Sequence, residues 1–377
     1  MKKEKIEKEL YDLEKDFRLR TVKTNKQKLF NFSSNDYLAL AKDRELLENF
    51  YSNIDLEKFK LSSSSSRLID GSYTTVMELE KEVEKIYSKP CLVFNSGFDA
   101  NSSLIETFFN KDSLIITDRL NHASIYEGAI NCGAKILRYN HLDINSLENF
   151  LEKYSKNYED ILVITETVYS MDGDIANLKE IINLKKKYTF QLMVDEAHSY
   201  GVYGYGISYT ENLIEHIDFL VIPLGKAGAS VGAYVICDEI FKKYLINKNR
   251  KFIYSTALPP INNLWNLYIL KNMENFKTRI NTLKNLTDFS LKKLDELNIK
   301  TVSNSHIISI IIGDNKKASK ISENLKKKSY LVYSIKEPTV PKNTARLRIS
   351  LTADMKENEL LNFFETLKEE LILINEE

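Results

Sequence analysis

The stretch LVIPLGKAGASVGAY, residues 220–234, places one lysine between an apolar run and a run of small residues. The chain has 53 lysines and arginines, nearly all of them among other charges, so the surroundings of Lys226 stand out. An ammonium group that loses water and charged neighbours holds its proton less tightly than a surface lysine does. The pattern therefore predicts a nucleophilic lysine just beyond a buried strand.

Short apolar runs of the same kind recur along the chain and alternate with segments of helical periodicity. Strands buried on both faces have this composition, and their alternation with helices favours a mainly parallel sheet. We therefore predict an α/β fold. The expected strands are CLVF at 91–94, LIIT at 114–117, KILRY at 135–139, ILVIT at 161–165, QLMVD at 191–195, FLVIP at 219–223 and AYVIC at 233–237.

The two ends of the chain have different patterns. Residues 6–17 place apolar side chains at helical spacing, which predicts an amphipathic helix. A long helical stretch is expected from about Pro260 to Leu297, followed by HIISIII and ARLRISL, two strands with a helix after each. This order indicates a smaller α+β domain. The predicted domains are an N-terminal helix and extension at 1–45, a large domain at 46–275 and a small C-terminal domain at 276–377.

Charge and hydropathy argue against several classes of partner. The 53 basic and 53 acidic residues cancel, which removes the general electrostatic reason to expect nucleic acid. The most apolar run, IISIII at 307–312, is too short to span a bilayer, and the basic start lacks an apolar core. We expect a cytoplasmic protein without a membrane partner. Three widely spaced cysteines, Cys91, Cys132 and Cys237, favour buried reduced thiols over a disulfide framework or a metal site.

Polar side chains follow five of the expected strands. In a parallel sheet, ligands bind beyond the carboxyl ends of the strands. Ser96, Gly97 and Phe98 open a helix whose free N–H groups suit a phosphate. The other strand ends are expected to contribute His122, Ser170, Asp195 with His198, and Lys226.

Each of these features has an ordinary structural explanation when it is taken alone. A helix-opening SGF turn is common, His122 or Asp195 can cap a turn, and Lys226 can extend to water. Together, an acid, a lysine and an anion cradle are what pyridoxal phosphate needs. Competing motifs fit less well, because GKAG lacks the hydroxyl of a Walker loop and GVYGYG at 201–206 reverses the dinucleotide glycine order.

The run LSSSSSRLIDGS, residues 61–72, has two interpretations. A serine run taken alone indicates a flexible linker. Here Arg67, Gly71 and a helix beginning near Thr74 follow directly. We therefore predict that Ser62–Ser66 form an ordered polar loop.

Eight segments together resemble one known family, the α-oxoamine synthases, which are pyridoxal phosphate enzymes of the aspartate aminotransferase fold type. The resemblance extends from about Arg18 to Ala353. Its first and last motifs favour members that condense L-alanine with a pimeloyl thioester, on coenzyme A or acyl carrier protein, in biotin biosynthesis. Other members use glycine or serine with another acyl-CoA, and a noncatalytic protein of this fold is a further alternative. The segments are NFSSNDYLAL, SGFDAN, DRLNHASIYEG, TETVYSMDGDIANL, MVDEAHSYGVYG, LGKAGAS, IYSTALPP and PTVPKNTARLRISLTA.

The resemblance implies a role for each matching residue of the cofactor site. Lys226 matches the imine-forming lysine, which also serves as base for the α-proton. Asp195 matches the acid that keeps the pyridine nitrogen protonated, and His122 the imidazole that stacks on the ring. His198 and Ser170 match residues near the phenolic oxygen. The phosphate cradle is matched by Ser96, Gly97 and Phe98.

The same resemblance implies a shared active site and a substrate site. Thr256 matches a phosphate contact supplied by the other subunit, which implies a homodimer. Arg348 matches the clamp for the amino acid carboxylate, where a planar guanidinium suits a planar anion. Asn35 matches a second carboxylate contact, and Arg18 and Thr339 match positions near the acyl substrate.

The chain departs from the family pattern at a few positions. Pro223 replaces a threonine that commonly bonds the phosphate, and Ala39 replaces a common glycine. The glycine of GKAGAS is displaced, and the serine run replaces much of a glycine-rich loop. We expect these departures to affect cofactor affinity and acyl recognition more than the central chemistry.

Overall fold

The structure, a computed structural model, describes residues 2–22, 28–56 and 60–376. It consists of two compact units. The large unit comprises Leu38–Tyr169 and Ile175–Ile280, and the small unit comprises Met1–Tyr37, Ser170–Asp174 and Asn281–Glu377. The domain boundaries expected after residues 45 and 275 stay predictions.

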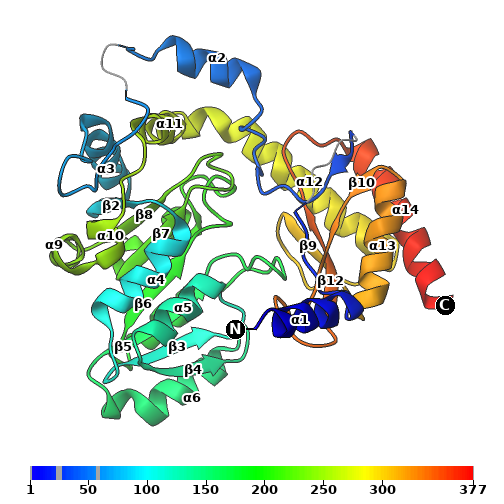
Figure 1. The fold of residues 1–377 in the computed structure, drawn as a ribbon, viewed down its shortest axis with the longest axis horizontal. Helices are drawn as coiled ribbons and strands as arrows, with labels where there is room; N and C mark the ends of the chain where they lie inside the picture. The colour runs from blue at the N-terminus through cyan, green and yellow to red at the C-terminus, as the bar shows by residue number, and fades with distance from the viewer. Residues whose placement is uncertain (1, 23–27, 57–59, 377) are drawn as a thin grey trace. The chain divides into compact units, whose positions relative to one another are not determined.

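The large unit is built on a seven-stranded sheet with the order β2-β8-β7-β6-β5-β3-β4 (Figure 1). β8 is antiparallel to both of its neighbours, β2 and β7, and the remaining strands run parallel. The predicted mainly parallel sheet is therefore confirmed. Its strands are β2 (Cys91–Phe94), β3 (Leu114–Asp118), β4 (Lys135–Tyr139), β5 (Ile161–Glu166), β6 (Gln191–Asp195), β7 (Phe219–Pro223) and β8 (Ala233–Cys237).

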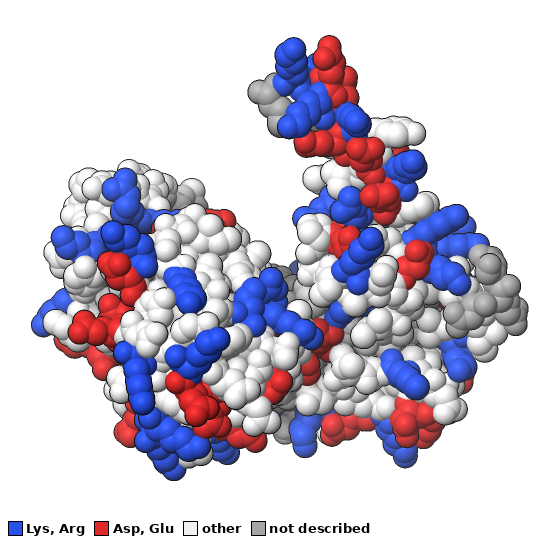
Figure 2. All heavy atoms as spheres, turned by 90° about the horizontal axis from the view of Figure 1, so that it is seen from below, with Lys and Arg blue, Asp and Glu red and all other residues white. Residues whose placement is uncertain are grey.

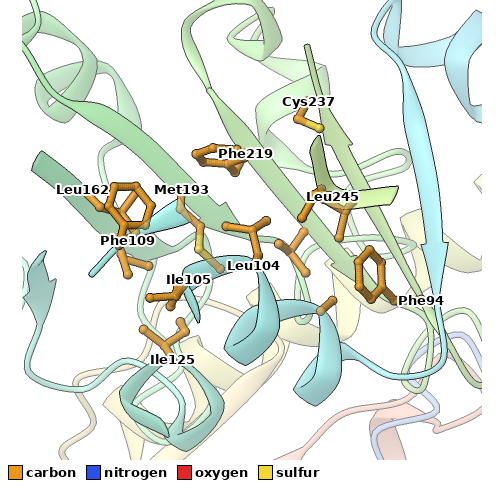
Figure 3. Close-up of a cluster of buried hydrophobic side chains, with 14 of the residues drawn as sticks. Phe94, Leu104, Ile105, Phe109, Ile125, Leu162, Met193, Phe219, Cys237 and Leu245 are labelled. Carbon is orange, nitrogen blue, oxygen red and sulfur yellow. The ribbon is translucent and has the colours of Figure 1, made fainter. Parts of the chain in front are cut away.

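Helices pack on the sheet because its strands are apolar on both faces. Figure 3 shows part of the resulting core, in which Leu104 and Ile105 of one helix and Ile125 of another meet Met193 and Phe219 of the sheet. The helices of this unit are α2 (Arg44–Ser52), α3 (Thr74–Tyr87), α4 (Gly97–Phe108), α5 (Ala123–Asn131), α6 (Ile144–Tyr154), α7 (Leu178–Leu184), α8 (Ile207–Thr210), α9 (Glu239–Lys248), α10 (Arg250–Tyr254) and α11 (Pro260–Lys271). Short 3-10 turns lie at Ser155–Asn157 and Ile214–His216.

The long helical stretch expected from about Pro260 to Leu297 is present, but it is divided into separate helices. α11 ends at Lys271, a 3-10 turn covers Met273–Phe276, and α12 runs from Lys277 to Glu296. Asn272 lies at the break, where its side chain donates to the Tyr268 carbonyl at 2.8 Å. An asparagine side chain that bonds the preceding turn competes with continuation of the helix. Apolar periodicity on both sides of Asn272 conceals this break.

The small unit contains a three-stranded antiparallel sheet with the order β11-β12-β9. The two predicted strands are β9 (Ile307–Gly313) and β12 (Ala345–Ser350), and each precedes a helix as expected. Sequence analysis missed the short strands β1 (Phe30–Asn31), β10 (Tyr330–Leu331) and β11 (Tyr333–Ile335), of which β1 and β10 pair in parallel. The helices are α1 (Lys3–Lys15), α13 (Asn315–Lys327) and α14 (Glu357–Glu376), together with most of α12.

Charge is mixed over the surface (Figure 2), and the three cysteines differ in burial. Figure 2 shows basic and acidic side chains interspersed over the face in view. In the described parts of the chain, no helix is both long and apolar enough to cross a bilayer. The same residues include no cluster of potential metal ligands. Cys91 and Cys237 are buried free thiols, whereas Cys132 is only half-buried.

Candidate active site

The carboxyl ends of five strands lie at the same edge of the large unit's sheet. β3, β5, β6 and β7 form a continuous parallel series, and β2 runs in the same direction because β8 is antiparallel to both β2 and β7. Lys226 follows β7 at this edge. Its side chain is half-buried, so it is less enclosed than the apolar sequence around it suggests.

Asp195, the last residue of β6, is held in a fixed orientation. Its side chain is buried and accepts hydrogen bonds from Asn101 Nδ2 at 2.6 Å and from the Ala197 N–H at 2.7 Å. Asn101 belongs to α4 and also donates to Ser124 Oγ of α5 at 3.1 Å. Two helices therefore position the acid that was predicted to bind the cofactor nitrogen. Sequence analysis did not identify Asn101.

Glu166, the last residue of β5, lies opposite Asp195 in the strand register. Its carboxyl is buried and accepts the His122 backbone N–H at 2.5 Å. Burial, and then the neighbouring charge of Asp195, raises the pKa of Glu166 well above its ordinary value. Sequence analysis missed this residue, although a carboxyl at the end of an apolar strand was a visible sign.

His122 caps the N-terminus of α5, and its Nδ1 accepts the Ser124 N–H at 3.2 Å. A neutral ring bonded in this way carries its proton on Nε2. Loss of hydration lowers the pKa of His122, the Asp195 charge opposes this shift, and the Lys226 charge adds to it. The three residues predicted to be catalytic are therefore close enough to influence one another. His122 as a residue nevertheless remains accessible to solvent, as a residue that stacks on a cofactor must be.

The predicted phosphate cradle begins α4. Ser96 Oγ accepts the Asp99 N–H at 3.0 Å, and the first-turn N–H groups of Gly97 and Phe98 have no partner within the helix pattern. A Cβ on Gly97 would lie 2.6 Å from Pro223 Cγ. The ring of Pro223 therefore packs against the cradle and requires glycine at position 97.

The serine run is an ordered loop, as predicted. Ser66 forms a bridge with Thr256, and the Ala257 N–H donates to the Ser65 carbonyl at 2.9 Å. Asn95 Nδ2 donates to the Thr256 carbonyl at 2.6 Å, which connects this segment to the residue before Ser96. Thr256 itself is exposed.

The two remaining residues predicted for the cofactor site, His198 and Ser170, have different surroundings. His198 is buried in the segment that follows β6. Ser170 belongs to the small unit, where its carbonyl accepts Arg348 Nε at 2.6 Å. The contacts of Ser170 are therefore those of the predicted carboxylate clamp.

Arg348 lies in β12 and is buried among neutral acceptors. Nη1 donates to Ser350 Oγ at 2.7 Å, and Nη2 donates to the Tyr37 hydroxyl at 3.3 Å. The Tyr37 hydroxyl in turn donates to Asn35 Oδ1 at 3.0 Å, so the structure joins both predicted carboxylate contacts through Tyr37. These bonds and the bond to Ser170 use three of the five guanidinium N–H groups. Within the described residues, two remain for a bidentate carboxylate.

The MDGD motif holds the segment that contains Ser170. Arg346 forms a buried ion pair with Asp172. Gly173 has φ +69°, and a Cβ there would collide with the Ile307 carbonyl. Only glycine satisfies both conditions. The motif therefore fixes the backbone acceptor that Arg348 uses.

His306 was not predicted, yet it lies beside this cluster. Its side chain is 1% exposed, and its ring meets the Tyr37 ring edge-on with centroids 4.2 Å apart. Neither ring nitrogen has a hydrogen-bond partner among the described residues. Burial, and then the Arg348 charge, lowers the pKa of His306 to about 3. The imidazole is therefore neutral at physiological pH.

The structure does not join the two residues predicted near the acyl substrate. Arg18 Nη2 donates to Asp16 at 3.0 Å. Thr339 Oγ1 instead accepts Arg20 Nη2 at 2.9 Å. The acyl roles of Arg18 and Thr339 stay predictions.

Comparison with known proteins identifies the family. The model of aminotransferase class I and II matches residues 27–367. The chain belongs to this family. Curated 8-amino-7-oxononanoate synthases are similar: that of Haemophilus ducreyi is 42% identical and covers 89% of each chain, and that of Chlorobaculum parvum is 38% identical over 87% of this chain and 86% of the relative.

Solved structures give the same result. The 8-amino-7-oxononanoate synthase of Francisella tularensis matches with TM-score 0.79 and 29% identity over 92% of this chain and 98% of that chain. The Sphingomonas wittichii serine palmitoyltransferase, at TM-score 0.88 and 23% identity over 99% and 98%, shares the fold. These matches confirm the predicted family resemblance, the fold class and the assignment as a pyridoxal-phosphate-dependent acyltransferase.

Proposed function

We propose that this protein condenses L-alanine with a pimeloyl thioester to give 8-amino-7-oxononanoate in biotin biosynthesis. The thioester is carried on coenzyme A or on acyl carrier protein. The observation that supports this proposal most strongly is the 42% identity, over 89% of both chains, to a curated 8-amino-7-oxononanoate synthase. Arg348 supports it as well, because its unused N–H groups suit an amino acid carboxylate.

The residues at the sheet edge fit pyridoxal phosphate. The first turn of α4 offers N–H groups to the phosphate, and His122, which is accessible to solvent, offers its ring face to the pyridine. Asp195, already oriented by Asn101, suits the ring nitrogen. When bound, the cofactor supplies an electron sink that makes loss of the amino acid α-proton possible.

Lys226 has two tasks in this proposal. Its amine would hold the cofactor covalently, and once released by alanine, Nζ would take the proton from the alanine Cα. Asp195 would keep the ring nitrogen of the cofactor protonated. His122, with its Nδ1 accepting from Ser124, presents a neutral ring to the cofactor face. His198 and Ser170 act near the phenolic oxygen.

Arg348 and Asn35 bind the carboxylate of alanine. The guanidinium cannot rotate freely, because Ser170, Ser350 and Tyr37 hold three of its N–H groups. A new bond then forms between the alanine Cα and the thioester carbonyl carbon, and the thiol departs. Carbon dioxide is lost from the former alanine carboxylate, and a proton returns to the same carbon.

We also propose a cytoplasmic homodimer whose active site is shared between subunits. Thr256 of one copy contacts the cofactor phosphate of the other. The exposure of Thr256, on a segment braced by Ser65 and Asn95, supports such a contact.

A product assay tests the reaction. The purified protein is incubated with pimeloyl-CoA or pimeloyl-acyl carrier protein and with alanine, glycine or serine, and the products are identified by mass spectrometry. We expect 8-amino-7-oxononanoate with alanine and none with the Lys226→Ala variant. Turnover of glycine or serine with another acyl-CoA, and not of alanine with either pimeloyl donor, would place the protein elsewhere among the α-oxoamine synthases.

A further inference from the structure

Three neighbouring parallel strands of the large unit end in buried carboxyl groups. Asp118 ends β3, Glu166 ends β5 and Asp195 ends β6, and their exposed fractions are 0%, 2% and 3%. In the strand order β6-β5-β3, Glu166 lies on the middle strand, and the register sets it directly opposite Asp195. Adjacent carboxylates in a buried site repel each other, so such groups do not all ionise together.

Asp118 has three hydrogen-bond donors to its carboxyl and Asp195 has two. Asp118 accepts His141 Nδ1 at 2.9 Å and the N–H groups of Leu120 and Leu142 at 2.8 and 3.0 Å. Asp195 accepts Asn101 Nδ2 and the Ala197 N–H. Donors of this kind stabilise an ionised carboxylate.

Glu166 has far less compensation for a negative charge. Among the described residues, the His122 N–H is the one hydrogen-bond donor to its carboxyl, at 2.5 Å. That bond requires only one carboxyl oxygen, and a protonated acid supplies it as well as an ionised one. Of these three carboxyls, Glu166 therefore loses the least hydrogen bonding when it is protonated.

We propose that Glu166 is a positioning residue that stays protonated beside Asp195, so that its carboxyl fixes the backbone of His122 and the negative charge of the pair belongs to Asp195. His122 and Asp195 are the residues proposed to contact the face and the nitrogen of the cofactor ring. Glu166 reaches both of them from a single strand end. Its carboxyl fixes the position of His122 and leaves the negative charge on Asp195. Glu166 itself does not contact the cofactor.

Four groups influence the Glu166 carboxyl, two on the neighbouring strands β6 and β3, one just before α5 and one shortly after β7. Burial raises its pKa most, Asp195 of β6 raises it further, the His122 N–H and Lys226 lower it, and Asp118 of β3 raises it. A raised folded pKa means that the native state retains a proton that the unfolded state releases above about pH 4.5. The wild-type protein then loses stability as the pH rises, whereas a glutamine at this position has no proton to retain.

The experiment compares the full-length, cofactor-bound wild type with Glu166→Gln in denaturant unfolding from pH 5 to pH 8. We expect the ratio of their unfolding constants, wild type over variant, to rise by up to about tenfold per pH unit. Glu127→Gln, on the helix that His122 caps, is the matched control and leaves the ratio flat. A flat ratio for Glu166→Gln, or one that falls with pH, overturns the proposal.

A second variant separates charge from position. Glu166→Ala removes the acid and also the acceptor of the His122 N–H. Its unfolding ratio therefore has the same pH slope and a constant offset, and this slope decides the question even if the glutamine variant fails to fold.

The cofactor absorbance provides a readout of position. Glu166→Gln keeps an oxygen acceptor without charge, so the midpoint of the pH titration of the cofactor absorbance stays within a few tenths of a pH unit of the wild type. Glu166→Ala shifts that midpoint. A shift of a full pH unit in the glutamine variant shows that Glu166 is ionised and overturns the proposal. These measurements need no acyl substrate, so they stand or fall independently of the product assay.

Discussion

The strand-end carboxyls of the large unit and the Arg348 cluster of the small unit bury charge by opposite means. Asp118, Glu166 and Asp195 are three buried acids on adjacent strands, and burial with the neighbouring charge of Asp195 raises the pKa of Glu166 well above its ordinary value. Arg348 is a single cation surrounded by neutral acceptors, and a guanidinium keeps its charge at any relevant pH. The strand-end carboxyls are therefore sensitive to a change in protonation, whereas the Arg348 cluster is sensitive to a change in side-chain geometry.

The largest effect is expected at the lysine beside the carboxyls. Lys226→Ala removes both the covalent cofactor contact and the base for the α-proton, so turnover falls on the order of 10⁴-fold or more. The absorbance of the lysine-bound cofactor disappears as well. Steady-state kinetics and absorbance spectra of the purified variant check this. Substantial residual turnover in that variant contradicts the proposed role of Lys226.

A smaller effect is expected at Arg348, where the planar geometry of the side chain matters. Arg348→Lys keeps the positive charge and loses the planar fork, so charge-assisted hydrogen bonds worth about 1.5–3 kcal/mol are lost. We expect the KM for alanine to rise by about 10- to 100-fold with little change in cofactor affinity. Arg44→Lys, a surface substitution in an exposed ion pair, serves as control. An unchanged KM would show that charge alone suffices at position 348.

The smallest expected effect appears only in acid. His306 is neutral in the folded protein because its pKa is lowered to about 3, whereas the unfolded chain takes up a proton below about pH 6.5. The wild type therefore loses about 2 kcal/mol of stability between pH 8 and pH 5 through this residue. The His306→Leu variant should not show this part of the loss in stability. Denaturant unfolding at pH 8 and at pH 5 measures the free energy of unfolding of both proteins. Equal losses in the two proteins would show that His306 is protonated when folded.

Most of the fold follows from local pattern, but strand direction does not. The runs KILRY, QLMVD, FLVIP and AYVIC form strands with the predicted bounds. AYVIC nevertheless runs antiparallel to its neighbours, because burial on both faces gives either orientation the same composition. Asn272 likewise breaks a helix within apolar periodicity that continues on either side.

The candidate site was predictable where a residue directly follows a strand. Asp195, which ends β6, and Lys226, which comes shortly after β7, were proposed in this way, and their roles stay predictions. Asn101 was missed because it reaches Asp195 from 94 residues away in the chain, and no short motif records such a pairing. Tyr37 and His306 were missed for the same reason, since their relation to Arg348 exists only once the chain has folded.

The antiparallel strand β8 has a consequence for biosynthesis of the chain. β2 lies at the edge of the described sheet, and its neighbour there is β8, which the ribosome makes only after β3 to β7. In a nascent chain that ends before Ala233, the middle strands can pair with one another, but β2 still lacks its partner strand, β8. The residues just before the turn at Ser96 therefore lack their strand partner in the sheet until residues 233–237 have been made.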